Sequence, residues 1–280
     1  MTPGARGGPP SYVTELGAIV AGALRQLVRQ PSHSRRAVAA RYWARRALLL
    51  TALLAVLIAV LMVALDATEI GWMPPRGTAA LWPVRIITDF GKSAYVLWTL
   101  ALLVVALVLI AAKLGAWRRV VLLSLATRVQ FLFLAVLVPV LIGDVLKGII
   151  GRGRPFVGGE ANPFNFSHFA WSEAYSSLPS GHATTAFALA FAVSALWPRT
   201  TAWMFGYAIA IAVSRLVLLA HHPSDVVAGA LTGIIGAMAV RYWFAARRLA
   251  FTIQPDGRIV ALPGPSLDQL KKVARGALAS

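Results

Sequence analysis

The sequence contains no cysteine, which excludes disulfide bonds, iron–sulfur clusters and thiol catalysis. It is also poor in charge, since charged residues make up 13% of its 280 residues. Hydrophobic residues make up 58%, and the mean hydropathy is +0.71. This composition favours a membrane protein over a soluble domain. The net charge of +17 would suggest nucleic acid in a soluble protein. Here most cations flank apolar runs, which favours anionic headgroups and no nucleic-acid partner.

Apolar stretches along the chain predict an all-α, polytopic membrane protein with six transmembrane helices. About 20 apolar residues cross a bilayer as a helix. By that criterion the spans lie near 47–66, 94–112, 120–143, 183–198, 202–220 and 226–244. The fourth is short and Ala-rich, so hydropathy supports it least. A polar, Arg-rich segment precedes the first span and no small-residue cleavage site follows it, so we expect a retained span and not a signal peptide.

The distribution of Lys and Arg orients these spans. Twenty of them fall on the side of the two termini and seven on the other side. The positive-inside rule therefore places both termini in the cytoplasm. We expect three parts: a basic cytoplasmic N-terminal segment (1–46), a six-helix membrane domain (47–245) and a basic cytoplasmic C-terminal tail (246–280).

Shorter helices are predicted beside the spans. Apolar residues recur at helical spacing from Tyr12 to Leu27 before Pro31, which indicates an in-plane amphipathic helix. A short interfacial helix is predicted near 81–92. Ser266 and Gln269 fit a capping box that would start a C-terminal helix, although a solvated basic tail is the alternative.

Three polar clusters lie at the ends of apolar spans, where ionisable residues are costly and indicate function. The first runs from Lys147 to Arg154-Pro155, after the third span. The second is Pro179-Ser180-Gly181-His182, before the fourth span. The third runs from Ser214-Arg215 through His221 to Asp225, between the fifth and sixth spans. The directions of the spans bring all three clusters to one side of the membrane.

The first two clusters and Arg215 have the chemistry of a phosphate site. Lys147, Arg154 and Arg215 supply three cations, and Arg offers paired donors that match phosphate oxygens. Ser180 and Gly181 stand at the start of a helix, where free N–H groups and the helix dipole attract anions. Gly181 also lets the backbone approach a ligand closely. We therefore predict an oxyanion site for a tetrahedral phosphate.

Two histidines and a carboxylate complete the predicted site. His221 and Asp225 are four residues apart, so Asp225 can hold the imidazole tautomer that leaves the other nitrogen free to attack phosphorus. His182 would protonate the leaving alkoxide and then act as a base toward water. Because fixed cations stabilise the transferring phosphoryl group, we expect neither a metal nor another cofactor.

The order Lys-x6-Arg-Pro, Pro-Ser-Gly-His and Ser-Arg-x5-His-x3-Asp resembles the three signature motifs of the type 2 phosphatidic acid phosphatase (PAP2) superfamily, which includes bacterial membrane lipid phosphatases. The resemblance covers about residues 85–240, and the segment 87–91 is similar to one common in bacterial members. It implies that phosphate is bound by the residues of the first two motifs and Arg215, namely Lys147, Arg154, Ser180, Gly181, His182 and Arg215. It also implies that His221 is the nucleophile, Asp225 its partner and His182 the general acid.

Some residues have two readings. His222 competes with His221 for the nucleophile role, although spacing favours His221. Arg152 is interpreted as a contact behind the site or to a headgroup. Asp144 either pairs with Lys147 or ends the span. The aromatic residues around His168 indicate an interfacial belt more than a substrate clamp.

These features favour a phosphatase that removes a terminal phosphate or pyrophosphate from a lipid through a phosphohistidine, at the periplasmic face of a bacterial inner membrane. A lipid phosphotransferase would use the same residues, and an anionic-lipid transporter would need only the cations. The sequence does not distinguish phosphatidylglycerophosphate, phosphatidate, undecaprenyl pyrophosphate or a lipid A phosphate as substrate, nor does it predict an oligomeric state.

Overall fold

The computed structural model describes residues 11–159 and 162–278, and this part of the chain is mainly helical. Its α-helices are α1 (Tyr12–Val28), α2 (Arg36–Ala64), α3 (Trp82–Asp89), α4 (Ser93–Ala112), α5 (Ala116–Ile150), α6 (Gly181–Leu196), α7 (Thr201–Val217), α8 (Pro223–Ala246) and α9 (Leu267–Leu278). Single-turn helices lie at Glu69–Trp72, Ala79–Leu81 and Pro198–Thr200. Two short strands, β1 (Phe251–Ile253) and β2 (Ile259–Ala261), form an antiparallel hairpin that the hydropathy pattern did not predict.

Among the described residues, five helical stretches are long and apolar enough to cross a membrane: Arg36–Ala64, Ala79–Ala112, Ala116–Ile150, Pro198–Val217 and Pro223–Ala246. The helix α6 is apolar but has only 16 residues. The predicted all-α membrane fold is therefore confirmed, whereas the count of six spans, which needs α6 to cross, stays a prediction. The helix predicted at 120–143 extends to 116–150, because backbone hydrogen bonding continues through charged residues at which a hydropathy window stops.

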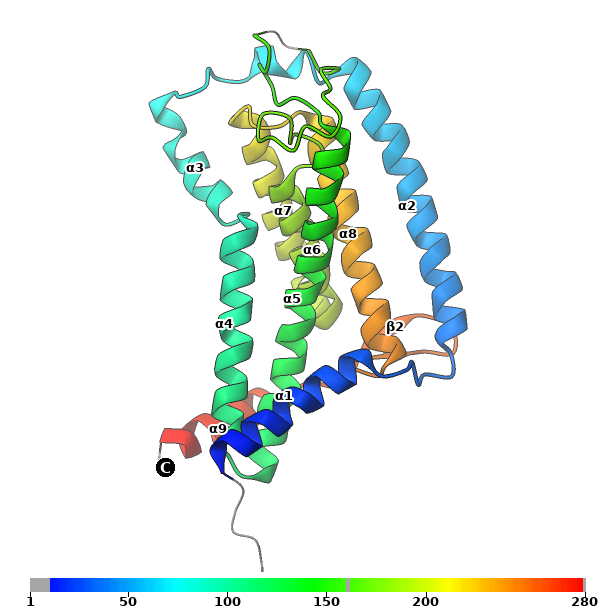
Figure 1. Cartoon of the computed structure of the whole chain (residues 1–280), viewed down its shortest axis with the longest axis vertical. Helices are drawn as coiled ribbons and strands as arrows, with labels where there is room; N and C mark the ends of the chain where they lie inside the picture. Colours follow the sequence, from blue (N-terminus) through cyan, green and yellow to red (C-terminus); the bar gives the residue numbers. More distant parts are fainter. Residues whose placement is uncertain (1–10, 160–161, 279–280) are drawn as a thin grey trace, which may run out of the picture.

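The bundle has two distinct ends (Figure 1). The helices α1 and α9 and the hairpin lie at one end, and α3 and the described parts of the loop between α5 and α6 (151–159 and 162–180) lie at the other. The flanking helices are confirmed as helices: Ser11 caps α1 through the N–H of Thr14, and α3 falls within the predicted 81–92. The predicted capping box also forms, with the N–H of Ser266 2.9 Å from Gln269 Oε1 and the N–H of Gln269 3.2 Å from Ser266 Oγ.

The helix α5 and the Ala-rich α6 pack against α8 in the centre of the bundle. Small residues allow the close contact, since a Cβ at Gly229 would lie 2.5 Å from the carbonyl oxygen of Ser180. Toward the hairpin, Phe131 packs edge-on against Phe244 and Phe251, with ring centroids 5.4 and 4.7 Å away. This packing fixes the N-termini of α6 and α8 relative to each other, and it thereby positions the polar residues at those N-termini.

The helix α5 ends at Ile150, and Gly151, which has a φ of 60°, caps it and turns the chain into the following loop. Backbone hydrogen bonds then fold the loop back on itself. The N–H of Arg154 is 2.9 Å from the carbonyl oxygen of Ala174, and the N–H of Ser177 is 3.0 Å from that of Arg152. The first polar cluster is thereby held beside the residues that precede α6.

Candidate active site

The three polar clusters meet at a cavity of about 690 Å³ at the α3 end of the bundle. Of the residues predicted from sequence, the structure places six on its wall: Lys147, Arg154, Gly181, His182, Arg215 and His221. Ser180 and Asp225 do not line it, because both side chains are fully buried behind the wall. The residues come from α5, the following loop, α6, α7 and the α7–α8 turn. The predicted convergence of the motifs is therefore present in the fold.

The three cations are held from three separate segments. Lys147 Nζ lies 2.8 Å from Asp144 Oδ1, so the pairing that the sequence left open does form. Arg154 lies 3.5 Å from the exposed carboxylate of Glu173. The guanidinium of Arg215, which is largely buried, donates to Thr88 Oγ1 at 2.8 Å. Each cation is oriented, yet the Nε atoms of Arg154 and Arg215 are buried without a hydrogen-bond partner among the described residues. Such donors are suited to an anion.

The start of α6 forms another part of the wall. The first N–H groups of a helix have no acceptor within the helix and are available to an anion. A Cβ at Gly181 would lie 2.9 Å from Lys147 Nζ, so the absent side chain makes room for the ammonium group. The N–H of Ser180 donates to the carbonyl oxygen of Asp225 at 2.9 Å, which joins α6 to α8. The Ser180 hydroxyl has no partner within the described chain, and its predicted role in phosphate binding stays a prediction.

One of the two ring nitrogens of His221 forms a hydrogen bond within the protein. Its Nδ1 lies 2.9 Å from the carbonyl oxygen of Ser177 and 3.8 Å from Asp225 Oδ2. A carbonyl can only accept, so Nδ1 carries the proton and Nε2 keeps its lone pair. Burial lowers the pKa of His221, and the nearby Asp225 only partly opposes this. The imidazole is therefore neutral near pH 7, which is the nucleophilic form.

Asp225 is held in a buried network behind His221. Its Oδ1 accepts from Arg152 Nη1 at 2.6 Å, and its Oδ2 accepts from Ser177 Oγ at 2.6 Å and from the N–H of His222 at 2.9 Å. Because Ser177 also supplies the carbonyl that binds His221, the carboxylate and the imidazole are positioned by the same residue. The sequence predicted direct pairing of Asp225 with His221, and the structure adds Ser177 between them.

Arg152 lies in the protein interior and does not face the membrane surface. Its guanidinium is fully buried and binds Asp225, Ser224, the carbonyl of Pro163 and Asp66, whose Oδ2 is 2.8 Å from Nη2. Of the two readings of Arg152, the structure supports a contact behind the site. Sequence reasoning missed Asp66, although a carboxylate at the end of the first apolar run was an available signal.

The remaining ambiguous residues lie away from the cavity. His222 is fully buried, with Nδ1 3.2 Å from the carbonyl of Asp66. His168 Nδ1 lies 2.7 Å from the carbonyl of Ile150. Of the aromatic side chains in the same loop, Phe164, Phe169 and Trp171 are exposed, and none of the three lines the cavity. These positions fit the reading of the aromatics as a surface belt.

The sequence motifs did not identify the α3 side of the cavity. Arg85, Asp89 and Lys92 line it, together with Thr88. Gly91 approaches His182 closely, since a Cβ there would lie 3.3 Å from His182 Cδ2. The only signals were the similarity of residues 87–91 to a segment of the bacterial family members and two cations on the sparsely charged side of the chain.

Comparison with known proteins agrees with this geometry. The model of the PAP2 superfamily matches residues 128–249. The chain is 32% identical over 179 residues to the lipid A 1-phosphatase of Rhizobium johnstonii, covering 62% of this chain and 71% of that protein. It is 35% identical over 127 residues to the lipid A 1-phosphatase of Rhizobium etli, covering 45% and 55%. It is 33% identical over 110 residues to a putative undecaprenyl-diphosphatase, YbjG, of Escherichia coli, covering 39% of this chain and 52% of that protein.

No solved structure matches the chain significantly. With its motif residues gathered at one cavity in a bundle of apolar helices, the chain belongs to the PAP2 superfamily and is a membrane phosphatase.

Proposed function

We propose that the enzyme hydrolyses a terminal phosphate or pyrophosphate of a membrane lipid through a phosphohistidine formed on His221. The observation that carries the proposal is one cavity lined by three cations, the start of α6 and two histidines. A binding protein would need only the cations. Two observations argue for chemistry: the imidazole of His221 is neutral and oriented, and His182 Nε2 has no hydrogen-bond partner among the described residues.

The reaction proceeds in two balanced steps. His221 Nε2 attacks phosphorus, the bond between phosphorus and the lipid oxygen breaks, and His182 gives its proton to the leaving oxygen. A water then attacks phosphorus, the N–P bond breaks, and His182 takes the proton of that water. Lys147, Arg154 and Arg215 stabilise the negative charge on the equatorial oxygens during both steps. Asp225 stabilises the charged imidazole that forms on His221.

The cavity is proposed to open at the periplasmic face of a bacterial inner membrane, with both termini in the cytoplasm. The excess of cations on the side of the termini supports this orientation. In the fold, α1 and α9 lie at the end opposite the cavity, as that orientation requires (Figure 1). The apolar face of α1, on which Val13, Leu24 and Val28 are exposed, suits a helix that lies in the membrane plane.

The relatives suggest two substrate classes. Two are named for the removal of the 1-phosphate of lipid A and one for cleavage of undecaprenyl diphosphate. We propose a lipid A phosphate first, because the alignment with the Rhizobium johnstonii protein covers the largest part of this chain among these relatives. Arg85 and Lys92 line the same cavity, and we propose that they contact the substrate beyond its transferred phosphate.

The test is phosphate release by the purified enzyme from lipid A, undecaprenyl diphosphate, phosphatidate and phosphatidylglycerophosphate in detergent. We expect His221→Ala to lower the rate by about 10³-fold or more, because the nucleophile is lost. The matched control is His168→Ala, whose histidine lies outside the cavity and whose activity should equal that of the wild type. Full release by His221→Ala would overturn the mechanism. Labelled phosphate recovered on an added acceptor lipid, and not in solution, would assign transfer in place of hydrolysis.

A further inference from the structure

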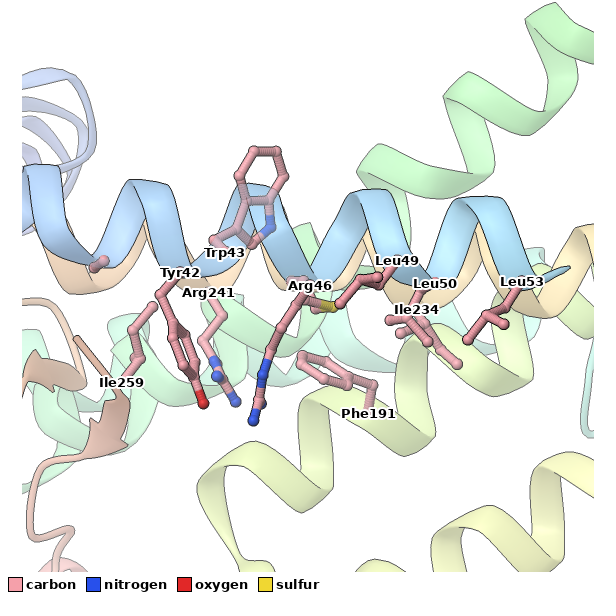
Figure 2. A pocket seen from close by; sticks show the side chains of 12 residues that line it. Tyr42, Trp43, Arg46, Leu49, Leu50, Leu53, Phe191, Ile234, Arg241 and Ile259 are labelled. Atoms are coloured by element: carbon pink, nitrogen blue, oxygen red, sulfur yellow. The ribbon is translucent and has the colours of Figure 1, made fainter. Parts of the chain in front are cut away.

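A second cavity lies at the other end of the bundle, between α2, α6 and α8, and it has a volume of about 360 Å³ (Figure 2). Two arginines, Arg46 on α2 and Arg241 on α8, line it beside Tyr42 and Phe191. Ile259 of the hairpin lies at the edge of this second cavity. The second cavity is therefore at the hairpin end of the bundle, away from the catalytic cavity (Figures 1 and 2). The catalytic mechanism uses none of these residues.

The charge of the two arginines is not neutralised by the protein. Within the described parts of the chain, neither Arg46 nor Arg241 forms an ion pair, and Arg241 Nε is buried without a hydrogen-bond partner. Their guanidinium groups lie on aromatic rings, Arg46 4.4 Å from the centroid of Tyr42 and Arg241 5.2 Å from that of Phe191. Asp256 lines the adjoining cavity but is paired with Arg258. The site therefore has an excess of positive charge and suits an anion.

The position of the arginines indicates that the anion belongs to a lipid. Arg46 immediately precedes the uncharged run 47–65 of α2 and the following turn, and Arg241 immediately follows the uncharged run 226–240 of α8. Both guanidinium groups therefore lie where the apolar part of the bundle ends, at the depth of lipid headgroups.

The rest of the cavity is mainly apolar and extends along α2 into its uncharged run. Leu49, Leu50 and Leu53 of α2 line it together with Ile234 and Met238 of α8. The part of α2 from Arg46 to Leu53 is roughly 10 Å long, measured along the helix axis. A charged end followed by an apolar wall matches a phosphate headgroup followed by the first carbons of an acyl chain. Free inorganic phosphate would use only the charged end.

We propose that this cavity binds an anionic phospholipid, with the phosphate held between Arg46 and Arg241 and an acyl chain lying against the leucines of α2. The lipid is a bound partner and not a substrate, because no histidine, serine, cysteine or carboxylate is among the lining residues. It joins α2 to α6 and α8 at the end of the bundle opposite the active site. The inference does not depend on the proposed reaction.

Purified full-length protein in mixed micelles tests this site, with retained lipid measured by native mass spectrometry. The probe is phosphatidylglycerol, with phosphatidylcholine and inorganic phosphate as comparison ligands. We expect Arg46→Gln and Arg241→Gln each to weaken phosphatidylglycerol binding about tenfold, as for the loss of a charged hydrogen bond. The matched control is Arg45→Gln, which removes the same charge from an exposed position outside the cavity and should bind like the wild type.

Three results would overturn the proposal. Equal losses in all three variants would mean general attraction of basic residues to an anionic surface. Unchanged binding in Arg46→Gln and Arg241→Gln would mean that the cavity is not used. Inorganic phosphate bound as tightly as phosphatidylglycerol, and lost in the same variants, would make the ligand a free anion. If Arg241→Gln does not elute as a folded species, Arg241→Lys keeps the charge but loses the paired donors, and a several-fold weakening is then expected.

Discussion

At the scale of single residues, the absent side chain of Gly181 makes room for Lys147 at the proposed phosphate site. A methyl group there would lie 2.9 Å from Lys147 Nζ, which is the end of a flexible chain and can move away. Gly181→Ala should therefore fold normally but displace the ammonium group from the phosphate. We predict a fall in kcat/KM of about tenfold, as for the loss of one charged hydrogen bond, with little change in Tm.

The comparison for this prediction is Gly206→Ala on α7, where a Cβ would meet nothing within 4 Å. It should leave both kcat/KM and the position of Lys147 unchanged. If Gly181→Ala retained full kcat/KM, Lys147 would not contribute to phosphate binding in the way its position indicates.

A second residue-scale feature is the buried carboxyl group of Glu69, which follows α2. Both of its oxygens lack a hydrogen-bond partner among the described residues, and burial, together with Asp66 and Asp225, raises its pKa to about 7. The ordinary pKa of this group is 4.5. At a pH between 4.5 and about 7, the folded protein therefore holds a proton that the unfolded chain releases. The contribution of Glu69 to the free energy of unfolding thus falls as pH rises through this window.

We predict that Glu69→Gln removes this dependence. The Tm of the variant minus the Tm of the wild type should increase between pH 5 and pH 8. Thermal unfolding of both proteins in the same detergent measures this difference. Asp268→Asn, which changes an exposed carboxylate of α9, should follow the wild-type profile. Parallel profiles for Glu69→Gln and the wild type would show that Glu69 does not hold this proton.

At the scale of elements, the contact between α6 and α8 determines the geometry of the site. At Gly229 a Cβ would lie 2.5 Å from the carbonyl oxygen of Ser180 and 2.9 Å from Ala183 Cβ, and neither backbone can move freely. Small residues of this kind allow helices in membranes to approach closely. The N–H of Ser180 also binds the carbonyl of Asp225 across this contact.

Gly229→Ala should therefore separate the two helix N-termini. We predict a loss of about 1–3 kcal/mol in the free energy of unfolding, as for overpacking of a core. Activity should also fall, because His182 and His221 are carried by the two sides of this contact. Denaturant unfolding and phosphate release measure the two effects. A variant as stable and active as Gly206→Ala would contradict the proposed role of the contact.

At the scale of the whole molecule, the absence of cysteine makes the orientation directly testable. Ser172→Cys places a thiol on the exposed loop above the catalytic cavity, and Asp268→Cys places one on α9 at the other end. With the cavity on the periplasmic side, a membrane-impermeant maleimide should label Ser172→Cys in intact spheroplasts. It should label Asp268→Cys only after permeabilisation. The reverse pattern would overturn the positive-inside assignment.

Much of the molecule could be predicted from local patterns along the chain. The apolar runs predicted the long helices, because a helix in a membrane must present about 20 apolar residues in sequence. Capping chemistry predicted the start of α9, since Ser266 and Gln269 interact across a single turn. The motifs predicted six residues of the cavity wall, because their spacing and the directions of the helices bring them to one end.

Features that depend on contacts between distant segments were decided only by the tertiary structure. Arg152 and Asp66 are 86 residues apart, and no local pattern indicates that they meet behind Asp225. The same is true of Ser177 and His221, and of Thr88 and Arg215. The sequence by itself predicted which groups would carry the chemistry and where the long helices lie, because motifs and apolar runs are local patterns along the chain. The fold decided how those groups are oriented, and it alone brought Arg46 and Arg241 together in a second charged cavity.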